Sequence, residues 1–237
     1  LNAQGKVTKV LVQNYANLTV ENMKLIGNEN TLYALSNNSG NVNIIGGSVI
    51  DGKNGVAFDV YKYGSYAEPV VTVEETVTIV GKIEAVAKIG NGYYATLTKA
   101  VEAAKNGETV ELLANATGAG VVIDKSITID LNGKTYTVNK CIGSSGTQTL
   151  GIQILKDNDV TIKNGTLAAT TVTEGKPVKM LVQNYANLTL TDVTLDGTGS
   201  AEMQYVLSNN SGEVNITGQT NITAPDGAVA FDVYDYT

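Results

Sequence analysis

The sequence contains no histidine, no arginine and no tryptophan among its 237 residues. Histidine is the usual general base near neutral pH and the commonest metal ligand, so its absence excludes most acid–base pairs and most metal centres. All 16 basic residues are lysines. Without arginine, no bidentate clamp for a carboxylate or phosphate can form. The composition therefore argues against an enzyme that needs either residue.

Positive charge is also scarce, because the net charge is −7 and only 16% of residues are charged. Such a chain repels phosphate backbones and anionic lipid surfaces, so we expect no nucleic-acid partner. No apolar run approaches the roughly 20 residues of a membrane helix, so we expect no membrane insertion. No signal peptide is visible, and the first residues resemble the middle of a strand, which predicts a piece of a longer protein.

Cysteine is limited to Cys141, which excludes an intramolecular disulfide and a cysteine metal cluster. We interpret Cys141 as a small packing residue at the start of a loop rather than as a reactive thiol. Two segments, 51–55 and 124–133, combine carboxylates with turns that are rich in backbone carbonyls. A calcium site is conceivable there, but the acidic density favours ordinary turns. We therefore expect no metal and no cofactor.

The chain does contain a long internal repeat. "LVQNYANLT" occupies 11–19 and 181–189, "SNNSG" occupies 36–40 and 208–212, and "VAFDVY" occupies 56–61 and 229–234. These offsets of 170, 172 and 173 residues indicate about 1.4 copies of one module. We predict that residues 1–86 are the C-terminal part of a first copy and that residues 87–237 are a second, nearly complete copy.

A shorter period lies inside the module. The segments "VTIKNGTL" (160–167), "LTLTDVTL" (188–195) and "VNITGQTNI" (214–222) share an alternation of apolar and polar residues broken by turn residues. The segment "ITIDLNG" (127–133) begins in the same way. The first apolar residues of the four segments, which we call their anchors, are spaced by 33, 28 and 26 residues: Ile127, Val160, Leu188 and Val214. Such short strands predict an all-β, right-handed parallel β-helix solenoid. A β-sandwich is the rival fold, although its strands rarely resemble one another.

One segment has helical rather than strand periodicity. In "TLTKAVEAAKNGETVELL" (96–113), apolar residues recur at Leu97, Ala100, Val101 and Ala104. Thr96 is placed as an N-cap, and Asn106–Gly107 as a stop. We predict one short helix, about residues 96–106, that caps the solenoid of the second copy.

The run "YYATLTKAVEAAKNGETVELL", followed by "ITIDLNGKTYTV" and "VTIKNGTL", resembles the parallel β-helix modules of large cell-surface proteins in gut Gram-positive bacteria. These modules belong to the pectin-lyase-like fold group. The resemblance covers 87–237 directly and 1–86 through the repeat. It implies a secreted or cell-wall-attached protein, but it implies little about activity.

The same fold group contains polysaccharide lyases and glycoside hydrolases, from which this chain departs by lacking arginine and histidine. Two carboxylates could still hydrolyse a glycoside. The candidate pairs, Asp157 with Asp159 and Asp232 with Asp235, fit solvated turn residues better. Seven N-x-S/T sequons also occur, and we attribute them to the Asn- and Thr-rich corners of the coils rather than to glycosylation: Asn17, Asn37, Asn115, Asn187, Asn209, Asn215 and Asn221.

Tyrosines give the remaining functional signal. In "VAFDVYKY" and "VAFDVYDY", alternation predicts that Phe58 and Phe231 point inward as equivalent core residues. The residues expected on the opposite, outward face are Asp59, Tyr61 and Tyr63 in the first copy and Asp232, Tyr234 and Tyr236 in the second. Such side chains could stack on sugar rings. The alternative, which we consider better founded, is that the tyrosines cover the flank of the solenoid or pack beneath a loop.

The sequence thus predicts a non-catalytic structural or adhesive module of an extracellular bacterial protein. It would serve as a stalk, spacer or display surface and make weak contact with a host or dietary glycan or with another surface protein. The rival function is a β-helix enzyme that acts on polysaccharide. Because both ends of the chain should expose unpaired strand edges, we also expect self-association through them.

Overall fold

The computed structural model describes residues 8–143, 148–171 and 175–235. Across these ranges the chain folds as an all-β parallel solenoid with a single short helix. It divides into two compact units, Leu1–Lys99 (unit 1) and Ala100–Thr237 (unit 2). The division at residues 86 and 87 concerns copies of the sequence repeat and stays a prediction.

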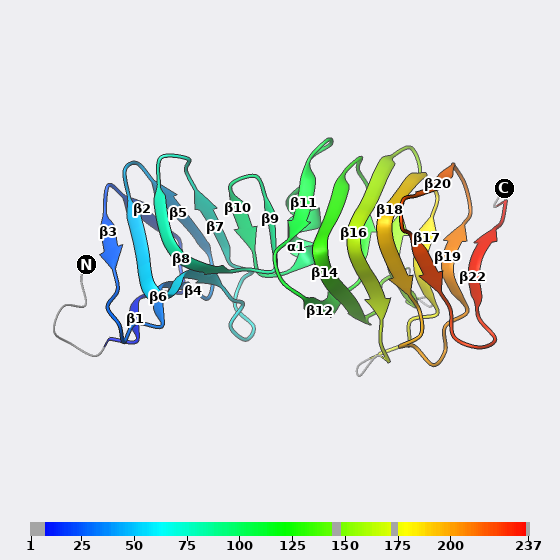
Figure 1. The fold of residues 1–237 in the computed structure, drawn as a ribbon, viewed down its shortest axis with the longest axis horizontal. Coiled ribbons are helices and arrows are strands. Elements are labelled where there is room, and N and C mark those ends of the chain that lie inside the picture. The colour runs from blue at the N-terminus through cyan, green and yellow to red at the C-terminus, as the bar shows by residue number, and fades with distance from the viewer. Residues whose placement is uncertain (1–7, 144–147, 172–174, 236–237) are drawn as a thin grey trace. The chain divides into compact units, whose positions relative to one another are not determined.

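Unit 1 is built from short strands that pair mainly in parallel (Figure 1). One column of paired strands has the order β1-β4-β6-β8. A second column has the order β2-β5-β7. β3 also pairs with β6, whereas β9 and β10 form an antiparallel hairpin in which β10 also pairs with β7. The strands are β1 (Val10–Asn14), β2 (Leu18–Glu21), β3 (Lys24–Ile26), β4 (Tyr33–Asn37), β5 (Asn41–Ile45), β6 (Val49–Val60), β7 (Val70–Val73), β8 (Thr78–Glu84), β9 (Ala87–Ile89) and β10 (Gly92–Tyr94).

Unit 2 continues the same plan with two parallel columns, β11-β14-β16-β18-β20 and β13-β15-β17-β19-β22. β12 pairs with β14, and β21 pairs with β18. The strands are β11 (Thr109–Leu112), β12 (Ala116–Ala119), β13 (Val121–Ile123), β14 (Thr128–Lys140), β15 (Leu150–Ile154), β16 (Asp159–Ala169), β17 (Met180–Asn184), β18 (Asn187–Asp196), β19 (Tyr205–Asn209), β20 (Val214–Thr217), β21 (Asn221–Thr223) and β22 (Val229–Val233).

The short sequence period is the period of the coils. Val160 of β16 stands opposite Leu188 of β18, which stands opposite Val214 of β20. These are the anchors that the sequence spaces by 28 and 26 residues. Each coil therefore places the same apolar position above its predecessor, which confirms the solenoid and not the sandwich.

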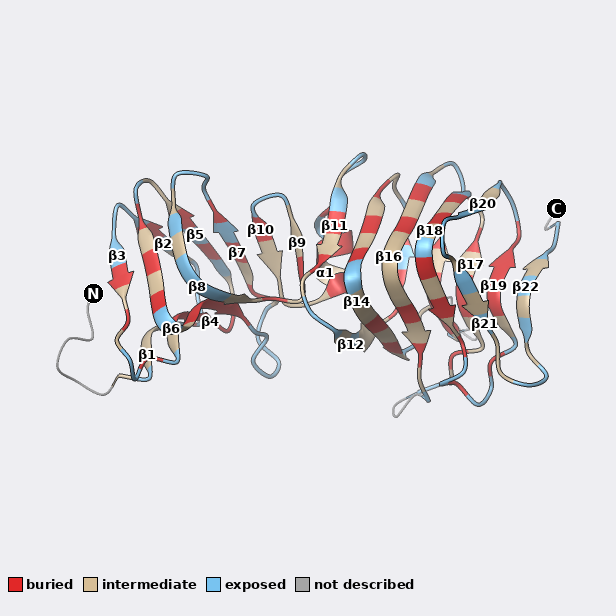
Figure 2. Ribbon diagram, viewed as in Figure 1, coloured by how far each residue is buried: buried red, intermediate tan, exposed pale blue. Residues whose placement is uncertain are grey.

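The core of unit 2 consists of columns of stacked apolar side chains. Ile129, Ile162 and Leu190 are in register and buried, whereas the threonine before each of them is half-buried. Buried and less buried residues alternate in this way along β14, β16 and β18 (Figure 2). A single coil cannot bury such a residue from both sides, so the core forms only when coils stack. Whether an apolar residue is buried in this fold thus depends on the coils on both sides of it.

The predicted helix exists and is shorter than expected, because α1 spans Leu97–Ala103. Thr96 is its N-cap, since the Lys99 N–H donates to Thr96 Oγ1 at 3.1 Å. Gly107 has a φ of 83°, which suits the expected stop. Ala100 and Val101 are buried at the start of unit 2, where the sequence predicts a cap.

The duplicated motifs supply buried asparagines at one corner of the coil. Asn14 Nδ2 donates to Asn37 Oδ1 at 2.8 Å, and Asn184 Nδ2 donates to Asn209 Oδ1 at the same distance. Asn184 also donates to Ala186 O at 2.7 Å. These side chains satisfy backbone and amide groups where the chain turns between strands. The sequons at Asn37 and Asn209 are therefore structural, as expected.

The glycine of each "SNNSG" motif is required by the same corner. Gly40 and Gly212 have φ values of 74° and 73°. A Cβ atom at either position would overlap the backbone of the preceding corner, at Ala16 or Ala186. Close stacking of corners thus explains why both copies keep this glycine.

We expect Asn184→Ala to lower the free energy of unfolding by about 2–3 kcal/mol, because it leaves the buried Asn209 oxygen and nearby backbone groups without partners. Asn215→Ala, at an exposed position, should change it by less than about 0.5 kcal/mol. Urea denaturation followed by circular dichroism measures both. Equal effects of the two substitutions would contradict a structural role for the buried asparagine.

The two phenylalanines differ in burial, contrary to expectation. Phe58 is 0% exposed, whereas Phe231 is 38% exposed, so the predicted burial of Phe231 is wrong. Both lie in register with a buried leucine, Leu35 for Phe58 and Leu207 for Phe231. The two side chains thus occupy equivalent places in their coils, and a difference in their surroundings explains the exposure.

That difference is the coil that follows Phe58. Ile83 of β8 stands opposite Phe58, and the ring of Tyr93 contacts the Phe58 ring with centroids 5.1 Å apart. β22, which carries Phe231, pairs with β19 alone among the described strands. The same local sequence therefore places Phe58 in the core, where a following coil covers it, and leaves Phe231 exposed, where no described coil follows.

We expect Phe58→Ala to destabilise the fold by about 3–5 kcal/mol, as truncation of a buried aromatic does. Phe231→Ala should lower the free energy of unfolding by about 1 kcal/mol, because folding removes less of the apolar area of this side chain from water. Denaturation midpoints of the two variants provide the comparison. A loss at Phe231 as large as that at Phe58 would show that Phe231 is covered in solution.

Candidate functional site

Three exposed tyrosines gather on the surface of unit 1. The ring centroid of Tyr15 lies 5.9 Å from that of Tyr63 and 5.6 Å from that of Tyr66, and Tyr63 and Tyr66 are 6.2 Å apart. All three rings are exposed. We call these residues the tyrosine cluster. An aromatic surface of this kind, with hydroxyl groups at its edge, suits a ligand with both apolar and polar faces.

The backbone around the cluster explains its position. Tyr15 follows the buried Asn14 at the corner after β1, and the loop after β6 returns to this corner. The Tyr63 N–H donates to Asn38 O at 3.2 Å, and the Tyr66 N–H donates to Tyr63 O at 3.2 Å. Gln13 Nε2 also donates to the Tyr15 hydroxyl at 3.0 Å. The loop is therefore tied by Tyr63 to the corner after β4, and the Asn38 N–H of that corner donates to Asn14 O at 2.9 Å.

The structure places the predicted tyrosines as follows. Tyr63 belongs to the cluster, whereas Tyr61 and Tyr234 are exposed without a described ring contact. Tyr236 lies outside the described residues. Sequence reasoning missed Tyr15 and Tyr66. The position of Tyr15 inside the exact nine-residue duplication was the available signal for it.

The two predicted aspartates are less accessible than the tyrosines. Asp59 is buried, and Asp232 is half-buried. One carboxylate oxygen of each, Oδ1, is buried and lacks a hydrogen-bond partner. Asp59 does lie on the strand face opposite Phe58, but that face is covered. We therefore leave both aspartates out of the candidate binding surface.

Burial raises the pKa of Asp59 to about 6. The hydrogen bond from Ser36 lowers this pKa, and the negative charge of Glu84, which stands opposite Asp59 in β8, raises it further. The folded protein thus favours the neutral form of the Asp59 carboxyl. The stabilisation that the neutral Asp59 carboxyl gives the folded protein is complete below about pH 4, near the pKa of an unfolded aspartate, and is lost as the pH rises through 6.

We expect Asp59→Asn to raise the free energy of unfolding at pH 8 by on the order of 2 kcal/mol and to leave it nearly unchanged at pH 4. The substitution removes the buried charge that opposes folding at high pH. Glu75→Gln, which removes an exposed carboxylate, is the matched control and should have little effect at either pH. Stabilisation by Asp59→Asn that is equal at both pH values would refute this account.

Unit 2 has a surface cavity of about 400 Å³ at its corresponding corner. Asp159 Oδ1 accepts a hydrogen bond from Asn187 Nδ2 at 2.9 Å, and the Asp159 N–H donates to Ser126 Oγ at 2.9 Å. Tyr185, the counterpart of Tyr15, lines the same cavity. The lining residues are Lys156, Asp157, Asn158, Asp159, Tyr185, Ala186, Asn187, Ser211 and Gly212.

The cavity contains one candidate carboxylate pair, Asp157 and Asp159. Asp157 has a φ of 66° and so belongs to a tight turn, and the carboxylate of Asp159 links two successive corners. The other pair consists of the half-buried Asp232 and the exposed Asp235, for which no shared contact is described. The first pair thus has the better setting for chemistry, but its hydrogen bonds fit a structural role.

The acidic turns considered for calcium use their carboxylates locally. Asp51 Oδ1 accepts from the Lys53 N–H at 2.7 Å. Both oxygens of Asp130 accept from Asn164 Nδ2, and Asp130 also lies 3.4 Å from Lys163 Nζ. Within the described ranges, no three acidic, cysteine or histidine residues form a group that could hold a metal ion.

Cys141 is half-buried, and its Sγ lies 3.1 Å from Lys176 O. Burial raises the pKa of this thiol, which lowers the fraction of reactive thiolate at neutral pH. These features fit the packing role expected for Cys141. It lies apart in sequence from both tyrosine corners, and we give it no part in the candidate site.

Comparison with protein-family models, curated proteins and solved structures gave no match. The β-solenoid therefore rests on the strand pairing and burial described above. In the described part of the chain, the helix is too short to cross a membrane. The candidate functional features are the two tyrosine corners and the stacked coils that carry them.

Proposed function

We propose that the chain is a non-catalytic structural and adhesive module of a bacterial cell-surface protein. Its role would be that of a stalk, spacer or display surface. The in-register stacking of similar coils supports this proposal, because a solenoid gains length simply by adding coils. The resemblance of 87–237 to pectin-lyase-like modules of gut Gram-positive bacteria adds a secreted or wall-attached location.

The adhesive part of the proposal rests on the tyrosine cluster. Tyr15, Tyr63 and Tyr66 expose ring faces together, and their hydroxyl groups can exchange hydrogen bonds with a polar ligand. A pyranose ring has one face rich in C–H groups and a rim of hydroxyls, so it matches such a surface. We propose a host or dietary glycan as the ligand, with another surface protein as the alternative partner.

We expect the chain to be retarded in native gels that contain a neutral plant polysaccharide or mucin glycans. Tyr63→Ala combined with Tyr66→Ala should weaken this retardation at least about fivefold, as loss of aromatic contacts worth about 1 kcal/mol would. Tyr234→Ala removes a similarly exposed tyrosine outside the cluster and should have no effect. Migration that is unaffected by every glycan tested would contradict the adhesive role.

The rival function is a polysaccharide lyase or glycoside hydrolase, and the cavity beside Asp157 and Asp159 is the observation that favours it. Against it stand the local hydrogen bonds of Asp159 and the lack of arginine and histidine in the sequence. We therefore place the enzyme second.

We expect no release of unsaturated uronides from acidic polysaccharides and no release of reducing sugars from neutral ones, with or without calcium. Absorbance near the ultraviolet band of unsaturated uronides and a reducing-end assay measure the two reactions. Product that accumulates steadily, and that disappears in Asp157→Asn or Asp159→Asn, would replace the structural proposal by the enzymatic one.

A further inference from the structure

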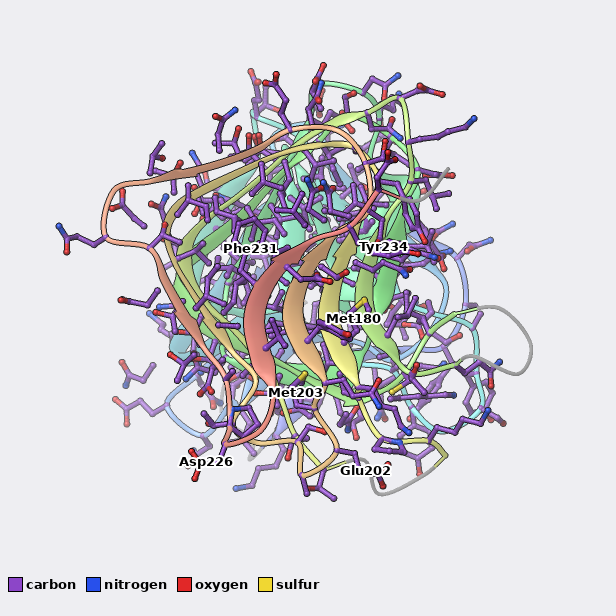
Figure 3. All side chains as sticks on the ribbon, turned by 90° about the vertical axis from the view of Figure 1, so that its right-hand side faces the viewer. Met180, Glu202, Met203, Asp226, Phe231 and Tyr234 are labelled. Carbon is purple, nitrogen blue, oxygen red and sulfur yellow. The ribbon has the colours of Figure 1, made fainter. Side chains whose placement is uncertain are left out.

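The last described coil of unit 2 exposes apolar side chains that are buried in unit 1. Val60 is 5% exposed, but its counterpart Val233 is 75% exposed. Ile44 is 0% exposed, and its counterpart Ile216 is 44% exposed. Figure 3 faces this end of the chain, with β22 and Phe231 toward the viewer. We call the surface of β20, β21 and β22 the end face.

Unit 1 shows what covers the equivalent surface there. Val73 of β7 stands opposite Ile44, and Ile83 of β8 stands opposite Phe58. Asn37 Nδ2 also donates to Val70 O at 3.0 Å. The segment Val70–Glu84 therefore supplies two parallel strands, their apolar side chains and one carbonyl for the buried asparagine.

The end face keeps the groups that hold this segment in unit 1. Asn209 Nδ2 donates to Gly212 O at 3.1 Å, as Asn37 does to Gly40 O at the same distance. Gly46 in unit 1 donates its N–H to Glu74 Oε2 at 2.6 Å, and its counterpart Gly218 has nearly the same backbone, with a φ of 62° against 64°. The polar frame is thus repeated along with the apolar surface.

We infer that the end face docks a two-strand coil with the sequence pattern of Val70–Glu84. The coil adds parallel strands to the open edges of β20 and β22 and buries Phe231. This inference rests on the proposed structural role and is independent of glycan contact. It specifies how the next coil would stack on β20 and β22.

A second copy docking by its leading coil is the less favoured occupant. Val20 of β2 and Leu25 of β3, which belong to that coil, are already buried. The leading coil therefore offers fewer of its apolar side chains to a partner than the end face does. A segment like Val70–Glu84 would present its apolar side chains directly, as it does in unit 1.

The test adds a fluorescent peptide of residues 68–94 to the full chain and measures anisotropy. We expect saturable binding, and slower hydrogen exchange of residues 229–234 in the complex. Phe231→Lys should weaken binding at least tenfold. Val122→Lys, which changes another exposed valine away from the end face, should not. The peptide with Ile83→Asp should also bind at least tenfold more weakly.

Three results would overturn the inference. They are the absence of saturable binding, equal binding to the Phe231→Lys chain, and equal binding of a scrambled peptide of the same composition. Concentration-dependent dimers without peptide, lost in Phe231→Lys, would instead identify a second copy as the occupant. Glycan retardation of Phe231→Lys is measured in parallel, so failure of docking can be told apart from failure of the adhesive role.

Discussion

The stacking of one coil on the next is the interaction on which this structure depends. Each coil is too thin to bury its own apolar residues, and the hydrophobic effect acts only when a neighbour excludes water. The buried asparagines, the left-handed glycines and the in-register apolar side chains all contribute to this contact. Within the duplicated "LVQNYANLT", this contact accounts for the buried asparagine, Asn14 in one copy and Asn184 in the other, whereas Tyr15 is exposed.

Function is left to the residues that stacking does not constrain. At the corner after β1, Tyr15 is exposed, and two further tyrosines from the loop after β6 gather around it. In unit 2 the same corner borders a cavity with Tyr185 and Asp159. One scaffold can thus carry different surfaces at equivalent places, which is what a display module requires.

The sequence predicted what depends on local pattern. Alternation and spacing located the coils, and Thr96 marked the helix start. Prediction from the sequence failed where the burial of a residue depends on residues far away in the chain. Whether the phenylalanine of "VAFDVY" is buried depends on a following coil that lies outside this hexapeptide. Asp59 is buried although the alternation predicted an outward position for it. The tyrosine cluster joins positions about fifty residues apart, which no local pattern reveals.

The most direct test compares hydrogen exchange in the two copies of "VAFDVY". Intrinsic exchange depends on local sequence, so residues 56–61 and 229–234 control for each other. Stacking predicts that amides of 56–61, in a strand paired on both sides, exchange at least about tenfold more slowly than those of 229–234 in the edge strand β22. Equal exchange in the two hexapeptides would contradict the claim that a neighbouring coil, rather than the sequence itself, protects the core.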